Sequence, residues 1–290
     1  MKQLLILSGK GGTGKTTIAS AFIKLSNAKA YADCDVDAPN LHLIMGQESE
    51  PRRTDYYGMP KAVIDTDLCI QCNQCIQNCR FDAISADSGS YKADKFDCEG
   101  CGVCELVCHV GAVSLKPAVA GELMLYVNGD MAFSTAQLKM GSGHSGMLVT
   151  EVKKQMKEAC DEAELAIIDG SPGIGCPVIA SLSGVDMVII VTEPSISGIS
   201  DMERIIKTAD IFQTKTAVCI NKYDTNHENT KRIEEYCCEK GLPFVGKIPF
   251  DTEAVKAINN GKTIVDVECL SGQAARQVFN NTMMVLSDLT

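Results

Sequence analysis

Eight of the fifteen cysteines fall into two copies of one spacing, CxxCxxCxxxC, and this repeat constrains the fold more than any other feature of the chain. The copies consist of Cys69, Cys72, Cys75 and Cys79, and of Cys98, Cys101, Cys104 and Cys108. Such a run is typical of thiolate ligands around a cubane of four irons and four sulfides. The sequence therefore predicts two [4Fe–4S] clusters within residues 69–108.

The spacing also predicts which thiols share a cluster. In a two-cluster run, three closely spaced cysteines bind one cluster and the fourth binds the other. We therefore assign the ligands as Cys69, Cys72, Cys75 and Cys108 for cluster 1, and Cys98, Cys101, Cys104 and Cys79 for cluster 2. The copies are offset by 29 residues, so we expect an internal repeat with pseudo-twofold symmetry. Structural zinc is the alternative, although zinc sites rarely use such consecutive short gaps.

A glycine-rich segment near the N-terminus forms the second strong motif. The run QLLIL predicts a buried strand, residues 9–16 fit GxxxxGK[ST], and an amphipathic helix follows. The glycines let backbone N–H groups approach phosphate oxygens, Lys15 reaches the terminal phosphates, and the Thr16 hydroxyl binds Mg²⁺. We expect the nucleotide to contact Gly9, Lys10, Gly11, Gly12, Thr13, Gly14, Lys15, Thr16 and Thr17.

Acidic side chains follow two predicted strands. Asp35 and Asp37 come shortly after an apolar strand around Tyr31, and Asp169 ends the apolar run ELAIID. Because ligands bind at the carboxyl ends of parallel strands, Asp169 is placed to hold Mg²⁺ or its water shell. Asp35 and Asp37 are candidates for positioning the attacking water and for the Mg²⁺ shell, with the order between them open.

A second lysine makes the phosphate loop unusual. Lys10 opens the segment KGGTGKTT, which resembles the deviant Walker A motif of the MinD, ParA and nitrogenase iron protein superfamily. The resemblance implies that Lys10 reaches across a homodimer to the partner's nucleotide, while Lys15 acts within its own chain. Further matching segments extend the resemblance over essentially the whole chain, namely DCDVDAPNLHL, IIDGSPGIGCPVIAS and VTEPSISGISDMERI. With the cysteine runs, they resemble MinD-type ATPases that carry an inserted 4Fe–4S ferredoxin domain.

The base of the nucleotide stays open at this point. Residues 221–224 read NKYD, which resembles the GTPase motif whose carboxylate accepts hydrogen bonds from guanine. The same asparagine also occurs on the adenine side in the deviant Walker superfamily. Asn221 and Asp224 are therefore candidates for base recognition, with ATP preferred and GTP not excluded.

Alternating strands and helices predict an α/β fold, namely a P-loop NTPase with a mostly parallel sheet flanked by helices, plus an inserted bacterial ferredoxin-like domain. We expect the ATPase domain at 1–57 and 119–290 and the insert at 58–118. The net charge of −10 argues against nucleic acid as the main ligand. No apolar run approaches the length of a membrane span, so we expect a cytoplasmic protein whose cysteines hold metal.

The resemblance implies an ATP- and Mg-dependent homodimer that couples slow hydrolysis to electron transfer toward a redox or iron–sulfur client. One alternative is a carrier or assembly factor, for which the cluster is cargo. A less favoured alternative is a MinD-like positioning ATPase, which needs a membrane-binding helix. The final predicted helix, at about 272–286, has only Arg276 as a base, so we expect it to pack on the sheet.

The remaining cysteines are expected to be mostly small buried hydrophobes. Cys176 lies seven residues after Asp169, the offset at which the resemblance places a cluster cysteine of the nitrogenase iron protein. A cluster bridging two subunits would need two ligands from each chain, and residues 141–149 supply His144 but no cysteine. A buried thiol is therefore the preferred interpretation of Cys176.

Overall fold

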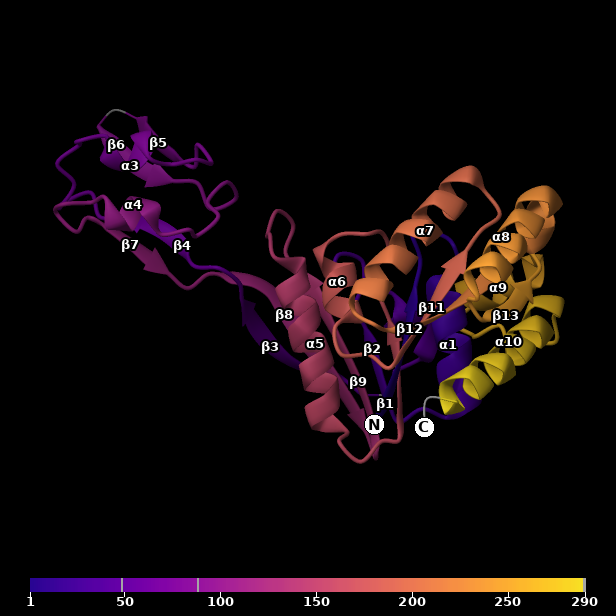
Figure 1. Cartoon of the computed structure of the whole chain (residues 1–290). Helices are drawn as coiled ribbons and strands as arrows, with labels where there is room; N and C mark the ends of the chain where they lie inside the picture. The colour runs from indigo at the N-terminus through magenta and orange to yellow at the C-terminus, as the bar shows by residue number, and fades with distance from the viewer. Residues whose placement is uncertain (48, 88, 289–290) are drawn as a thin grey trace.

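The structure is a computed structural model that describes residues 1–47, 49–87 and 89–288. Two regions stand apart in Figure 1: a broad layered body that holds both termini, and a slender arm that projects from one edge of the body. The chain leaves the body after Tyr57 and returns at Val119, and these two residues pair on neighbouring strands. The arm is therefore joined to the body by two adjacent segments of the chain.

A nine-stranded sheet forms the centre of the body, in the order β13-β12-β11-β1-β10-β2-β9-β8-β3. All neighbours from β13 to β9 are parallel, whereas β8 runs antiparallel to both β9 and β3. The strands are β1 (Lys2–Leu7), β2 (Ala30–Asp33), β3 (Arg52–Tyr57), β8 (Val119–Asn128), β9 (Met131–Leu138), β10 (Leu165–Asp169), β11 (Met187–Thr192), β12 (Lys215–Asn221) and β13 (Phe244–Ile248).

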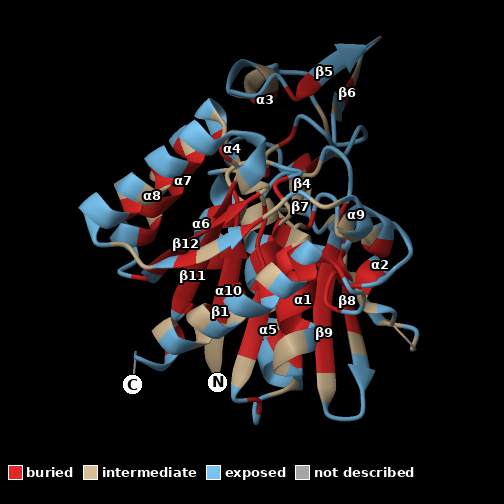
Figure 2. Ribbon diagram, turned by 90° about the vertical axis from the view of Figure 1, so that its right-hand side faces the viewer, coloured by how far each residue is buried: buried red, intermediate tan, exposed pale blue. Residues whose placement is uncertain are grey.

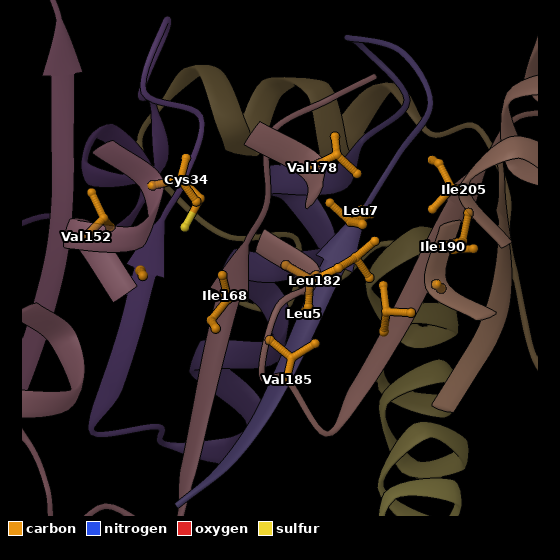
Figure 3. Close-up of a cluster of buried hydrophobic side chains, with 14 of the residues drawn as sticks. Leu5, Leu7, Cys34, Val152, Ile168, Val178, Leu182, Val185, Ile190 and Ile205 are labelled. Carbon is orange, nitrogen blue, oxygen red and sulfur yellow. The ribbon is translucent and has the colours of Figure 1, made fainter. Parts of the chain in front are cut away.

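Helices cover both faces because the central strands are apolar on both sides. On β1, Leu5 and Leu7 face one core, while Leu4 and Ile6 face the other, and all four are fully buried. One face carries α5 (Ser145–Ala159), α6 (Cys176–Leu182), α7 (Ile196–Ile211) and α8 (His227–Lys240). The opposite face carries α1 (Lys15–Ser26), α2 (Leu41–Met45), α9 (Thr252–Asn259) and α10 (Leu270–Ser287). Figure 3 shows Val178 and Leu182 of α6 beside Leu5 and Leu7 of β1, and Val152 of α5 beside Cys34.

The predicted α/β class is confirmed, including the mostly parallel sheet flanked by helices. The sequence did not predict β9, which lies between β2 and β8 and is nearly all buried. Its residues, MAFSTAQL, mix small and polar side chains, so neither alternation nor a continuous apolar run marks it as a strand. A short 3₁₀ helix, η1 (Tyr223–Thr225), follows β12.

In its described residues, the arm has two short two-stranded antiparallel sheets and two single-turn helices. Strand β4 (Lys61–Ile64) pairs with β7 (Val113–Lys116), and β5 (Ile84–Asp87) pairs with β6 (Ser90–Ala93), while α3 (Gln74–Gln77) and α4 (Val103–Leu106) lie between them. Figure 2 shows that buried residues concentrate along the strands of the body, whereas the arm is mostly exposed. A small core of its own stabilises the arm, and cysteines contribute to it.

The arm repeats its backbone geometry at the spacing of the cysteine runs. Left-handed residues recur 29 positions apart, namely Gln71 with Gly100, Asn73 with Gly102, and Asp82 with Gly111. Only the second copy uses glycine, which adopts positive φ without steric cost. The two halves of the arm therefore follow the same path around their cysteines, as the expected internal repeat requires.

The C-terminal helix packs against the sheet, as predicted. Ala275, Val278 and Leu286 of α10 are buried in the core shared with α1 and β13. Among the described residues, no helix combines the length and apolarity needed to cross a bilayer. The apolar face of α10 is therefore already covered within the body.

Candidate nucleotide site and cysteine cavities

The loop between β1 and α1 has the shape that phosphate binding requires. Gly12 and Gly14 adopt positive φ angles of 79° and 90°, and α1 begins directly at Lys15. The backbone N–H groups at the start of α1 are therefore free of intrahelical acceptors and can donate to an anion. A Cβ atom on Gly14 would lie 2.2 Å from the Asn221 amide nitrogen, so this position accepts only glycine.

A cavity lies over this loop at the carboxyl ends of the strands. Its lining includes every predicted phosphate-loop residue from Lys10 to Thr17, together with Asp35 and Pro172. Gly9 lies just outside this lining, where a Cβ would clash with the Cβ of Asp201 at 2.1 Å. Gly9 therefore allows α7 to lie close to the loop.

Lys15 forms a buried ion pair with Asp169. The ammonium lies 2.7 Å from Oδ1 of Asp169, and the carboxylate is fully buried. Although burial lowers the pKa of Lys15, the neighbouring Asp169 raises it above its ordinary value. The other oxygen of Asp169, Oδ2, is buried without a hydrogen-bond partner. A buried carboxylate with one free oxygen can bind a cation or an ordered water.

The acidic segment after β2 contains three aspartates with three different environments. Asp33 is fully buried and accepts hydrogen bonds from the backbone N–H groups of residues 35, 40 and 41, so it shapes the loop. Burial, together with the charge of Asp169, raises the pKa of Asp33 to about 7. Asp35 lines the phosphate cavity, and burial raises its pKa as well. Asp37 is exposed and does not line the cavity.

The second lysine is held within its own chain. Lys10 Nζ lies 3.2 Å from Oε2 of Glu193 and 3.4 Å from the Ser195 hydroxyl. Lys222 donates to the other oxygen of Glu193 at 2.5 Å and to the Gly12 carbonyl at 2.9 Å. Partial burial raises the pKa of Glu193, but the hydrogen bonds from both lysines hold it below its usual value. The pair of lysines therefore shares one carboxylate.

A second cavity continues from the phosphate cavity toward α9. The two share Gly12, Gly14, Thr17 and Ile258, so one ligand could occupy both. Its walls are largely apolar, including Ile248, Pro249, Phe250, Val255 and Ile264. These properties match a site for a flat heterocyclic ring joined to a phosphate chain.

The two residues predicted to recognise the base are both engaged in internal hydrogen bonds. The Asn221 amide nitrogen donates to the Thr13 carbonyl at 2.7 Å, which fixes the phosphate loop. Asp224 Oδ1 accepts from the backbone N–H of Phe250 at 2.8 Å. Asn221 lines the base-sized cavity, but Asp224 does not.

Each predicted cluster set lines one cavity in the arm. Cys69, Cys72, Cys75 and Cys108 line one small cavity, and Cys79, Cys98, Cys101 and Cys104 line another. The backbone also points N–H groups at the sulfurs, with Ala112 donating to Cys108 at 3.2 Å and Ala62 to Cys98 at 3.5 Å. The fourth cysteine of each run thus joins the cavity of the other run.

The thiols of each set are spread around their cavity. Among the described residues, no three His, Cys, Asp or Glu side chains lie close enough together to bind a single metal ion. A tetrahedral zinc site needs four ligands around one ion. A cubane instead occupies the space between four thiolates, and each cavity is lined by four cysteines.

The other seven cysteines differ in exposure, and Cys160 is half-buried. Cys34, Cys219, Cys237 and Cys269 are buried, in line with the expectation of small hydrophobic residues. Cys176 and Cys238 are exposed, so the prediction of a buried thiol at Cys176 is wrong. Cys176 is the first residue of α6 and directly follows the glycine-rich loop after Asp169. At this helix N-terminus the Cys176 side chain is exposed to solvent.

Several residues of the site were missed by sequence reasoning. Glu193 and Ser195 contact Lys10, and Lys222 binds the same Glu193 carboxylate, although all three come from segments far from the phosphate loop in sequence. Their position after β11 and β12 is the signal that could have found them, because polar residues after parallel strands meet at one edge. The sequence did not single out Asp33 from Asp35 and Asp37, because only its burial distinguishes it from them.

Comparison with known proteins supports a nucleotide-binding domain in this chain. The family model of the CobQ/CobB/MinD/ParA nucleotide binding domain matches residues 4–264. An uncharacterized protein of Methanocaldococcus jannaschii is 31% identical, with 96% of this chain and 95% of the relative covered. The septum site-determining protein MinD of Bacillus subtilis is 24% identical, with 91% of this chain and 81% of that protein covered.

Solved structures agree at the level of the fold. The septum site-determining protein MinD from Pyrococcus horikoshii, complexed with Mg-ADP, has a TM-score of 0.58 and 17% sequence identity. The alignment covers 100% of this chain and 98% of that chain. The likeness therefore concerns the arrangement of strands and helices.

Proposed function

The chain belongs to the CobQ/CobB/MinD/ParA nucleotide-binding family, and we propose that it is an ATP-dependent homodimer whose ferredoxin-like arm holds two [4Fe–4S] clusters and transfers electrons to a client protein. One observation carries the proposal. The two thiol sets inferred from spacing line two separate cavities, on a chain that also has a complete phosphate loop. The arm (58–118) would then be one domain, and 1–57 with 119–290 the other.

The nucleotide would lie across the two joined cavities. The phosphates occupy the loop cavity around Lys15, and the base occupies the apolar cavity beside α9. Adenine is favoured over guanine, because Asp224, the candidate carboxylate for guanine, lies outside the lining of this cavity. Guanine recognition would require a free carboxylate to accept from its N–H groups. ATP is therefore the favoured nucleotide.

Mg²⁺ and the attacking water would be held by residues around the buried ion pair. When the phosphates attract Lys15, its bond to Asp169 is released and that carboxylate becomes available to Mg²⁺ or its water shell. Thr16 supplies a hydroxyl at the first turn of α1. Asp35 lines the cavity, so it is the better candidate than Asp37 for positioning the water.

Dimer formation would require Lys10 to change partners. In the single chain, Glu193 holds Lys10 beside the loop at 3.2 Å. A lysine that reaches the nucleotide of a partner subunit must first leave this carboxylate. The contact therefore stabilises the monomer, and a bound triphosphate offers the competing negative charge.

The residues of the arm fit a resident metal group. A [4Fe–4S] cluster supplies one-electron transfer when it is bound. Each cavity takes cysteines from both repeats, so Cys79 and Cys108 tie the two halves of the arm together. Cys75, Cys98 and Cys104 also belong to the buried core of the arm. Loss of the metal would open that core, which favours permanent retention over a carrier role. Free thiols of this kind persist in a reducing compartment such as the cytoplasm.

A positioning function is the second candidate, because MinD proteins are among the relatives. That function would need a surface for a membrane or another large structure. The apolar face of α10 is buried in the body and is not available for this purpose. Purified protein that sediments with anionic vesicles only when ATP is present would favour this second candidate.

Metal content and nucleotide turnover test the proposal together. Protein purified without oxygen is expected to contain about eight irons and eight sulfides per chain. Cys104→Ser is expected to lower the iron content to about four, while ATP hydrolysis is retained. Cys238→Ser serves as the matched control, because this exposed thiol lies outside both cavities. Iron-free protein with a folded arm would overturn the electron-transfer proposal.

A further inference from the structure

The arm contacts the body through a loop as well as through its two connecting segments. His144 Nε2 lies 3.3 Å from Glu99 Oε2, with the side chains 33% and 43% exposed. Next to this pair, a Cβ on Gly141 would lie 2.8 Å from the ring of Phe96. Residues 96–99 of the arm therefore lie against residues 141–144 of the body.

Among the described residues, both arm side chains of this contact come from the second repeat. The positions 29 residues earlier are Asp67 and Ile70, where the second repeat has Phe96 and Glu99. Ile70 is 64% exposed, while Glu99 contacts His144. Ile70 and Glu99 each line the cavity of their own half. The pseudo-symmetry of the arm is therefore broken at the place where one half touches the body.

The other side of the contact leads to the nucleotide site. His144 caps α5, and a Cβ on Gly146 would lie only 3.0 Å from the carbonyl oxygen of Cys176, so α5 and the start of α6 are in close contact. Cys176 follows the 170–175 loop, whose Gly173 N–H donates to the Ser8 carbonyl at 2.9 Å. Pro172 of the same loop lines the phosphate cavity.

These contacts form one continuous path, and we propose that the His144–Glu99 contact is a latch through which the nucleotide state positions the cluster 2 half of the arm. The inference rests on the proposed function, because it assumes that both the nucleotide and the clusters bind. A γ-phosphate that moves the 170–175 loop shifts the N-termini of α6 and α5 together, since packed helices move as units. His144 then moves relative to Glu99, and the cluster 1 half, which lacks the contact, is unaffected locally.

The backbone at His144 favours such a role. Its φ of 69° is in the left-handed region, which a histidine adopts at a cost. Because Asn adopts this conformation readily, His144→Asn keeps the backbone but shortens the side chain. Glu99→Ile gives the second repeat the residue of the first. These two substitutions remove the contact from opposite sides while leaving all eight cysteines in place.

Hydrogen–deuterium exchange tests the latch on the full, iron-loaded chain without oxygen. Exchange is compared with Mg-ADP and with a non-hydrolysable Mg-ATP analogue, for residues 94–101 and for the equivalent residues 65–72. In the unmodified protein, we expect the nucleotide to change exchange at 94–101 and not at 65–72. His144→Asn and Glu99→Ile are expected to abolish that change, and Ile70→Ala is expected to keep it.

Two results would overturn the latch. One is unchanged exchange at 94–101 while residues 170–176 respond to the nucleotide. The other is a nucleotide response at 94–101 that persists in both His144→Asn and Glu99→Ile. Failure of the proposed function looks different, because the protein would then lack bound iron or show no nucleotide response at residues 9–17.

Discussion

The body and the arm bury their cores with different chemistry. The body packs Leu, Ile and Val side chains against both faces of a nine-stranded sheet. The buried core of the arm has eight residues, of which three are the cysteines Cys75, Cys98 and Cys104. A core this small supplies little apolar burial, so small domains usually depend on metal or disulfide links. We therefore expect the body to fold without its ligand, and the arm to depend on the metal that we propose it holds.

Removal of iron should affect the arm and not the body, and we expect it to have the largest effect on folding. A chelator applied after oxidation should unfold residues 58–118 and leave the body folded. Limited proteolysis should then cut within the arm, and nucleotide binding should persist. An iron-free arm that resists protease as well as the loaded arm would contradict the difference between the two cores.

A substitution in the phosphate loop should affect the body alone. Gly14→Ala combines a strained φ of 90° with a Cβ placed 2.2 Å from the Asn221 amide. We expect nucleotide affinity to fall by about 100-fold or more, which equals about 3 kcal/mol. Calorimetry measures the affinity, and iron content should remain at the level of the unmodified protein. A coupled loss of iron would show that the two regions do not fold independently.

Release of Lys10 should strengthen the dimer. Glu193→Gln removes the charge that holds Lys10 at 3.2 Å, so less free energy is needed to move the lysine to a partner subunit. We expect nucleotide-dependent dimerisation to tighten by about tenfold, as measured by sedimentation with a non-hydrolysable ATP analogue. Lys10→Gln is the opposing control and should remain monomeric. A weaker Glu193→Gln dimer would argue that Glu193 supports the dimer instead.

The smallest expected effect concerns the two halves of the arm. Asp82 adopts a φ of 51°, whereas the equivalent residue of the second repeat is Gly111. Asp82→Gly should relieve strain of up to about 1 kcal/mol in the first half. Slower local hydrogen exchange at 79–84 would support this, with iron content as the control. Faster exchange would mean that the flexibility of glycine outweighs the strain.

Local motifs predicted much of this structure. The cysteine spacing assigned two sets of four thiols, and each set lines one cavity. The turn residues and Pro117 predict an insert at 58–118, which stays a prediction; in the structure β3 ends at Tyr57 and β8 begins at Val119. Both predictions depend on neighbours in sequence, because loops and ligand runs are specified locally.

Long-range features were harder to predict. Lys10 and Lys222 meet at Glu193 because β1, β11 and β12 are adjacent in the sheet. Exposure of Cys176 depends on the loop before α6, and the His144–Glu99 contact depends on the direction in which the arm projects. Such contacts come from the tertiary arrangement, which no local periodicity specifies.

The claim that nucleotide state reaches one half of the arm has a direct test. Potentiometric titration followed by EPR, without oxygen, gives the reduction potentials of both clusters with Mg-ADP and with a non-hydrolysable Mg-ATP analogue. Glu99 lines the cavity proposed for cluster 2 and contacts His144. Movement of His144 relative to Glu99 should therefore change the electrostatic environment of that cluster. We predict that one potential shifts between the two nucleotides while the other stays constant. Two potentials that are identical in both nucleotide states would contradict the account.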